Sequence, residues 1–219
     1  MIPLRDVIPS RTVPFVTATL ILLNSAAWVL ELSMSPRALD HFVKLYGVVP
    51  GAFRPVSLLT SMFLHGGWFH VIGNMWWLWI FGDNVEDAFG HGRFLVFYML
   101  CGLTAGLGQI IMDSTSLLPT IGASGAIAGV MGAYFVLYPR SRVLTLIPFF
   151  LFAVVEVPAI FLLGLWFLMQ LINAGAVAAT ANTAGSGGVA FAAHVAGFVV
   201  GVLGVFVFRK RDRRAWDTY

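Results

Sequence analysis

The sequence has little charge and almost no cysteine, and each shortage excludes a class of protein. Of its 219 residues, 11% are charged and 59% are hydrophobic, and the mean hydropathy is +0.88. A soluble domain is usually about a quarter charged, so this chain lacks the polar side chains needed to cover a surface in water. The single cysteine, Cys101, excludes an internal disulfide and any site built from several cysteines. The composition indicates an integral membrane protein.

Other signals are also missing. No H-E-x-x-H motif occurs, and His65 and His70 are separated by about 140° around a helix, which is poor spacing for two metal ligands. We therefore expect no metal and no cofactor. The basic residues form no nucleic-acid-binding face, so no nucleic-acid partner is expected. A transporter or channel is disfavoured because the chain has no internal repeat and the inner halves of its apolar segments lack polar residues.

Six apolar segments approach the length of roughly 20 residues that a membrane-spanning helix needs. They predict an all-α integral membrane protein, a bundle of six transmembrane helices at 13–31, 67–82, 94–111, 121–138, 157–173 and 190–208. Three connections are distinctive. Residues 32–66 form a long outer loop whose apolar stretches we expect to associate with the membrane. Residues 143–156 are expected to be an interfacial segment, and the small residues of 174–189 a mobile outer loop.

Lysine and arginine indicate how the spans are oriented. If the N-terminus is cytoplasmic, ten of these residues lie in inner segments and three, Arg37, Lys44 and Arg54, lie in outer ones. Because cytoplasmic loops carry the excess of positive charge, both termini are predicted to be cytoplasmic. The predicted organisation is a cytoplasmic N-terminal segment (1–12), a six-span membrane domain (13–208) and a basic cytoplasmic tail (209–219). This is a multi-pass protein, and we expect it in the inner membrane of a prokaryotic cell.

Four polar residues lie inside the predicted spans at nearly one depth. With about 1.5 Å of rise per residue, Ser124 and His194 lie roughly 22 Å above the inner ends of their spans, and His70 roughly 20 Å. Asn74 follows His70 by one helical turn and shares its face. Taken singly, such a serine or histidine is also typical of helix packing. Their common level near the outer face instead predicts one shared polar site.

A serine and a histidine within hydrogen-bonding reach make an activated nucleophile and its general base. In the second to sixth predicted spans no carboxylate is placed to orient His194, so the expectation is a dyad rather than a triad. Ser124 opens its helix, where unpaired backbone N–H groups could bind an oxyanion together with His70 and Asn74. A non-catalytic protein that binds transmembrane helices in the same cavity is the alternative.

Four motifs together resemble the rhomboid family of intramembrane serine proteases. They are G-A-S-G at 122–125, H-G-G-W-F-H-V-I-G-N at 65–74, F-G-D-N-V-E-D at 81–87 and A-H-V-A-G-F-V-V-G at 193–201, and the resemblance extends from about Ser57 to Gly201. It implies an intramembrane serine endopeptidase with Ser124 as the nucleophile and His194 as the base. It also implies substrates among the transmembrane segments of other membrane proteins, which are cleaved near their outer ends.

The resemblance assigns supporting roles as well. His70, Asn74 and Gly122 would stabilise the oxyanion or the substrate, together with the Ser124 backbone. The residues with structural roles near the site would be His65, Gly125, Gly197, Gly201 and Glu86. Of these, Gly197 and Gly201 would let span six approach span four. Two departures stand out. The Trp-Arg pair of many relatives is replaced by F-R-P-V-S at 53–57. Ala128 occupies the place where some relatives carry an aromatic residue against the histidine.

Overall fold

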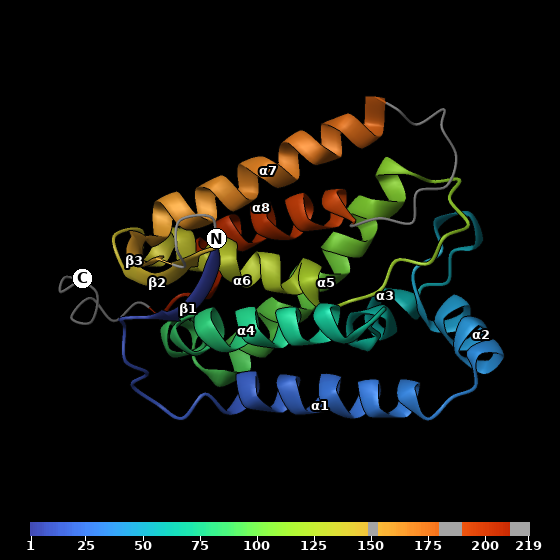
Figure 1. Ribbon diagram of the computed structural model, residues 1–219, viewed down its shortest axis with the longest axis horizontal. Coiled ribbons are helices and arrows are strands. Elements are labelled where there is room, and N and C mark those ends of the chain that lie inside the picture. The colour runs from blue at the N-terminus through green and yellow to red at the C-terminus, as the bar shows by residue number, and fades with distance from the viewer. Residues whose placement is uncertain (149–152, 180–189, 211–219) are drawn as a thin grey trace.

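The computed structural model describes residues 1–148, 153–179 and 190–210, which form a helical bundle with a small sheet at one end (Figure 1). The long helices are α1 (Phe15–Leu32), α4 (Trp68–Phe89), α5 (His91–Met112), α6 (Ser124–Leu137), α7 (Ala159–Ala179) and α8 (Phe191–Phe208). Within the described residues, four of them, α1, α5, α7 and α8, are long and apolar enough to cross a membrane. Helix α6 is apolar but shorter.

The segment 32–66 is largely helical. It contains α2 (Pro36–Tyr46), α3 (Ser57–Thr60) and two short 3₁₀ turns, η1 (Pro50–Ala52) and η2 (Ser61–Phe63). Helix α2 starts where Ser35 accepts a hydrogen bond from the Ala38 N–H, with proline at the first helical position. These elements lie at the end of the bundle opposite the sheet (Figure 1).

The expectation of an all-α chain is wrong at the other end. There β1 (Ile2–Asp6), β2 (Arg142–Ile147) and β3 (Ala153–Pro158) form an antiparallel sheet in the order β1-β2-β3. The segment expected to be interfacial therefore supplies two strands, as suits its β-branched residues. Arg142 and Glu156 form an exposed ion pair across them at 3.0 Å. Strand β1 pairs with residues far away in the chain, which a local pattern does not reveal.

Two predicted boundaries change as well. Helix α7 continues to Ala179, so the first residues of the predicted loop 174–189 are helical, as suits a run of alanines. The rest of that loop, 180–189, lies outside the described residues. Of the predicted tail 209–219, the structure describes Arg209 and Lys210, and the Lys210 N–H donates to the Ala88 carbonyl at the end of α4.

Helix α6 lies in the centre of the bundle, packed closely on α8 and α5 through glycines. A Cβ on Gly197 would overlap the Gly125 carbonyl oxygen, and one on Gly201 would overlap that of Gly129. On the opposite side, a Cβ on Gly125 would overlap Ala105 of α5. Since only glycine leaves room for such an approach, these residues set the spacing between α6 and α8.

Glu86 connects α4 to the start of α1. It is fully buried, and its carboxylate accepts hydrogen bonds from the N–H groups of Val16 and Thr17 at 2.9 and 2.8 Å and from the Thr17 hydroxyl at 2.7 Å. The first N–H groups of a helix have no partner within the helix, and a negative charge is favourable there. Glu86 therefore caps α1 from a neighbouring helix.

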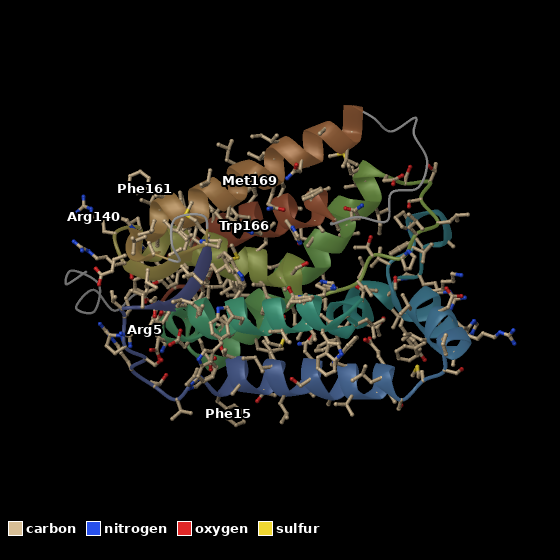
Figure 2. All side chains as sticks on the ribbon, viewed as in Figure 1. Arg5, Phe15, Arg140, Phe161, Trp166 and Met169 are labelled. Atoms are coloured by element: carbon tan, nitrogen blue, oxygen red, sulfur yellow. The ribbon has the colours of Figure 1, made fainter. Side chains whose placement is uncertain are left out.

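The outer surface of the bundle is apolar along the helices and charged at the sheet end. Phe15 and Phe161 are 68% and 69% exposed, whereas Arg5 lies in β1 and Arg140 just before β2 (Figure 2). Large apolar side chains in this number are favourable against lipid and costly in water. The chain is a multi-pass membrane protein in contact with the bilayer.

Candidate active site

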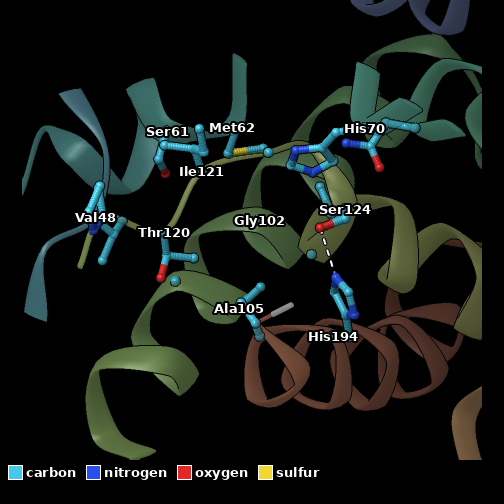
Figure 3. Close-up of a pocket in the computed structure, with 18 of the residues that line it drawn as sticks. Val48, Ser61, Met62, His70, Gly102, Ala105, Thr120, Ile121, Ser124 and His194 are labelled. Atoms are coloured by element: carbon cyan, nitrogen blue, oxygen red, sulfur yellow. Dashed lines mark hydrogen bonds between the residues drawn. The ribbon is translucent and has the colours of Figure 1, made fainter. Parts of the chain in front are cut away.

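Ser124 and His194 meet between α6 and α8. Ser124 is the first residue of α6, and His194 lies in the first turn of α8. The Ser124 Oγ lies 2.8 Å from the His194 Nε2, within hydrogen-bonding distance (Figure 3). The close packing of α6 on α8 at Gly197 and Gly201 brings the two side chains together. His194 is 8% exposed, so its ring is held by protein rather than by solvent.

The pair faces a cavity of about 660 Å³. His70, Asn74 and Gly122 also line it, so the structure brings together the polar residues that the sequence placed at one depth. The remaining wall comes from the segment before α4, from α5 and from the residues before α6, and it includes Val48, Met62, Ala105 and Thr120 (Figure 3). That wall is mostly apolar, with the hydroxyl groups of Ser61 and Thr120 among its residues.

Three hydrogen-bond donors are available around Ser124. The Gly66 N–H donates to the His70 Nδ1 at 3.3 Å, so in the neutral ring the hydrogen is on Nε2, which faces Gly122. Among the described residues, the buried Asn74 Nδ2 has no hydrogen-bond partner. The Ser124 N–H lies in the first turn of α6 and has no partner within the helix. His70, Asn74 and Ser124 line the same cavity, so these donors are available to an oxyanion that forms there.

Gly122 contributes space rather than a donor. Its N–H donates to the Ser61 carbonyl at 2.8 Å, so that N–H is not available to an oxyanion. Its φ is +122°, and a Cβ at this position would lie 2.6 Å from the His70 Nε2. The Gly122 N–H is thus not the source of the predicted stabilisation of the oxyanion or substrate, and the residue leaves room for His70 to approach.

His65 is buried next to His70. The His65 N–H lies 3.2 Å from both carboxylate oxygens of the buried Glu31 on α1, and the two imidazole rings meet edge to face with centroids 5.1 Å apart. Within the described residues neither ring nitrogen of His65 has a hydrogen-bond partner. Burial lowers the pKa of His65 to about 4, so the ring is neutral near pH 7 and packs against His70.

Two residues that sequence reasoning missed lie on α7 and contact His194. The Gln170 Oε1 lies 2.9 Å from the His194 Nδ1, and the Trp166 ring lies against the imidazole with centroids 5.7 Å apart and planes tilted by 36°. Ala128, where some relatives carry an aromatic residue, is buried in α6. The sequence did contain a signal for Gln170, which is a polar amide in an apolar segment, four residues after Trp166.

A second, smaller opening of about 220 Å³ reaches the pair from the side, between α4 and α7. It is lined by Phe69, Trp77 and Trp166 together with Ser124 and His194. In the part of the chain that the structure describes, no group of three or more histidine, cysteine or acidic residues is arranged to hold a metal ion.

The fold and the site geometry define a class of protein: a multi-pass membrane protein with a serine–histidine pair in a cavity that His70 and Asn74 also line. Residues 52–211 match the family model of the rhomboid domain. The chain belongs to the rhomboid family.

Similar curated proteins come from several organisms. Rhomboid protein 1, mitochondrial, of Saccharomyces cerevisiae is 31% identical over 152 residues, covering 68% of this chain and 40% of that protein. Rhomboid protease GluP of Bacillus subtilis is 41% identical over 76 residues, which is 35% of this chain and 14% of that one. Presenilin-associated rhomboid-like protein, mitochondrial, of Pongo abelii is 30% identical over 100 residues, 43% of this chain and 26% of that one. The chain thus spans less than half the length of each.

Proposed function

We propose that this rhomboid-family chain is an intramembrane serine endopeptidase, which hydrolyses peptide bonds in or near the transmembrane segments of other membrane proteins. The observation that carries the proposal is the 2.8 Å contact between the Ser124 Oγ and the His194 Nε2 at a cavity lined also by His70 and Asn74. A serine in a packing role needs neither a buried histidine on its hydroxyl nor unpaired donors beside it.

The chemistry begins at Ser124. Its oxygen attacks the carbonyl carbon of the peptide bond while the hydroxyl proton passes to the His194 Nε2. The carbonyl oxygen takes the electron pair of the C=O π bond and faces the Ser124 N–H, His70 and Asn74 donors. The C–N bond then breaks, and its nitrogen takes the proton from His194. Water hydrolyses the resulting ester by the same steps, releasing a carboxylic acid and restoring Ser124.

We propose six spans, formed by α1 and by the helices α4 to α8, with 13–208 as the membrane domain. Both termini, 1–12 and 209–219, would lie in the cytoplasm, and the membrane would be the inner membrane of a prokaryotic cell. The charge distribution supports this orientation, since Arg5 in β1 and Arg140 just before β2 both lie at the sheet end of the bundle (Figure 2). The cavity would then open to the outer side, where water can enter.

A substrate helix must unwind before its peptide bond can reach Ser124, because each backbone N–H and C=O in a helix is already paired. The expected substrates are therefore transmembrane segments with glycine, proline or polar residues near the outer end. The side opening between α4 and α7 supports entry from the bilayer.

The test uses purified protein, a model transmembrane substrate and the variants Ser124→Ala and His194→Ala. We expect cleavage by the native protein and by neither variant, and labelling by a serine-directed fluorophosphonate that Ser124→Ala abolishes. Cleavage that survives Ser124→Ala would overturn the proposal. Binding of the substrate helix without cleavage by the native protein would instead indicate a non-catalytic member that binds transmembrane helices.

A further inference from the structure

We propose that Gln170 is a positioning residue that holds His194 in the tautomer able to accept a proton from Ser124. This inference rests on the proposed protease function and extends the pair Ser124–His194 by a third member on α7. The three side chains form one chain of hydrogen bonds through the buried His194, with Gln170 and Ser124 on opposite nitrogens of its ring.

The orientation of the Gln170 amide is set by its own helix. Its Nε2 donates to the Trp166 carbonyl one turn earlier, at 3.3 Å. The Oε1 therefore points the other way, to the His194 Nδ1 at 2.9 Å. With the amide rotated by half a turn, the Gln170 oxygen would face the Trp166 carbonyl oxygen, and two acceptors would repel each other.

The direction of the amide determines the tautomer of the histidine. An amide oxygen only accepts hydrogen bonds, so the His194 Nδ1 must carry the hydrogen. A neutral imidazole has one ring hydrogen, and Nε2 is then left with a lone pair facing the Ser124 hydroxyl. In the opposite tautomer Nε2 would carry the hydrogen and could not take the proton that leaves Ser124.

Burial makes this contact costly to lose. Gln170 and His194 are each 8% exposed, so water does not readily replace the amide at Nδ1, and a buried donor without an acceptor is strongly unfavourable. When His194 becomes an imidazolium, the amide dipole still accepts its Nδ1–H. A carboxylate in this place would add a buried charge inside the bilayer. An amide orients the ring without that charge.

Helix α7 holds the ring from a second direction. Trp166 lies one turn before Gln170 and covers the imidazole with centroids 5.7 Å apart. Gln170 thus fixes rotation within the ring plane and Trp166 limits tilting out of it. One turn of α7 therefore holds His194 from two directions.

The test compares Gln170→Met, which keeps the length but removes the acceptor, with Gln170→Glu. A buried carboxyl in the bilayer is most stable in its protonated, uncharged form, which still offers an acceptor oxygen to His194 and an O–H donor to the Trp166 carbonyl. The control, Asn173→Leu, removes an amide from the same helix. For Gln170→Met we expect kcat to fall about 10- to 100-fold, comparable to the loss when a group that orients a metal-bound histidine is removed. KM should stay within about twofold because the substrate contacts are unchanged. Gln170→Glu should recover most of kcat, and Asn173→Leu should behave as the native protein.

A second readout does not depend on cleavage. In protein labelled with ¹⁵N-histidine, the His194 signals, assigned by their loss in His194→Gln, should show hydrogen on Nδ1 in the native protein. In Gln170→Met they should show the other tautomer or a mixture.

The outcomes separate the two proposals. A native protein that shows this tautomer but cleaves nothing overturns the protease function and not the ring geometry. Full activity and an unchanged spectrum in Gln170→Met overturn the positioning role while leaving the protease function intact. Equal losses in Gln170→Met and Gln170→Glu, with lowered thermal stability in both, also overturn it, because they indicate a purely structural residue.

Discussion

Gly122 has a φ of +122°, a conformation that residues with a side chain rarely adopt, and it lies directly against His70. The His70 ring is in turn held by the Gly66 N–H and by the edge of the buried, neutral His65. A single glycine therefore determines how close the His70 donor comes to Ser124. The clash of an added Cβ with His70 can be tested against glycines elsewhere in the chain, where an added Cβ would meet no neighbouring atom.

We predict that Gly122→Ala lowers kcat by about 100-fold, the loss typical when one oxyanion donor is displaced. The added Cβ would lie 2.6 Å from the His70 Nε2 and must push that ring away. Kinetics on a transmembrane substrate measure this. The matched control is Gly92→Ala, because a Cβ on Gly92 meets no atom within 4 Å. Activity of Gly122→Ala within twofold of native would contradict the prediction.

At the scale of elements, the contact between α6 and α8 carries the site, since one helix holds Ser124 and the other His194. The backbones approach so closely that a Cβ on Gly201 would overlap the Gly129 carbonyl. Helix α7 packs less tightly, and a Cβ on its Gly175 meets no atom within 4 Å. A glycine-to-alanine substitution should therefore destabilise the protein at Gly201 but not at Gly175.

Gly201→Ala is expected to destabilise the protein by about 1–3 kcal/mol, the usual cost of overpacking a tight contact, and to reduce activity by separating His194 from Ser124. Gly175→Ala should leave stability unchanged or raise it by up to about 1 kcal/mol, because alanine favours the helix. Thermal unfolding in detergent compares the two variants. Equal stability of both variants would contradict the prediction, because it would show that α6 and α8 can move apart with no loss in the free energy of unfolding.

At the scale of the whole molecule, the N-terminal strand is attached to the bundle far from the site. The Tyr134 hydroxyl of α6 donates to the Asp6 carboxyl at the end of β1, at 2.6 Å. Burial raises the pKa of Asp6 to about 7, and the nearby Asp83 acts in the same direction. The folded protein therefore binds a proton there more tightly than the unfolded chain does.

This predicts the sign of a pH dependence. The stabilisation from a raised carboxyl pKa is complete below about pH 4, the value for an unfolded aspartate, and is lost as the pH rises to about 7. The unfolding temperature of the native protein should thus fall between pH 4 and 8 by more than that of Asp6→Asn, which stays neutral. The exposed Asp40→Asn is the control, and it should follow the native curve. Parallel curves for Asp6→Asn and native protein would refute the role of Asp6.

Sequence reasoning went furthest where a local pattern carries the information. Apolar runs predicted the six long helices to within a few residues, apart from the C-terminal ends of α4 and α7. The shared depth of Ser124, His194 and His70 predicted that they would meet. Prediction from the sequence failed for the sheet, because β1 pairs with β2 across more than a hundred residues. No periodicity within 1–12 indicates that partner.

The sequence by itself determined the class of protein, the apolar helices and the polar residues that gather near Ser124, since hydrophobicity and helical rise act locally along the chain. Only the tertiary structure decided which residues hold the His194 ring in place. Gln170 and His194 are 24 residues apart, and their contact exists because α7 packs beside α8. Which histidine nitrogen holds the hydrogen follows from that contact, because an amide oxygen can only accept.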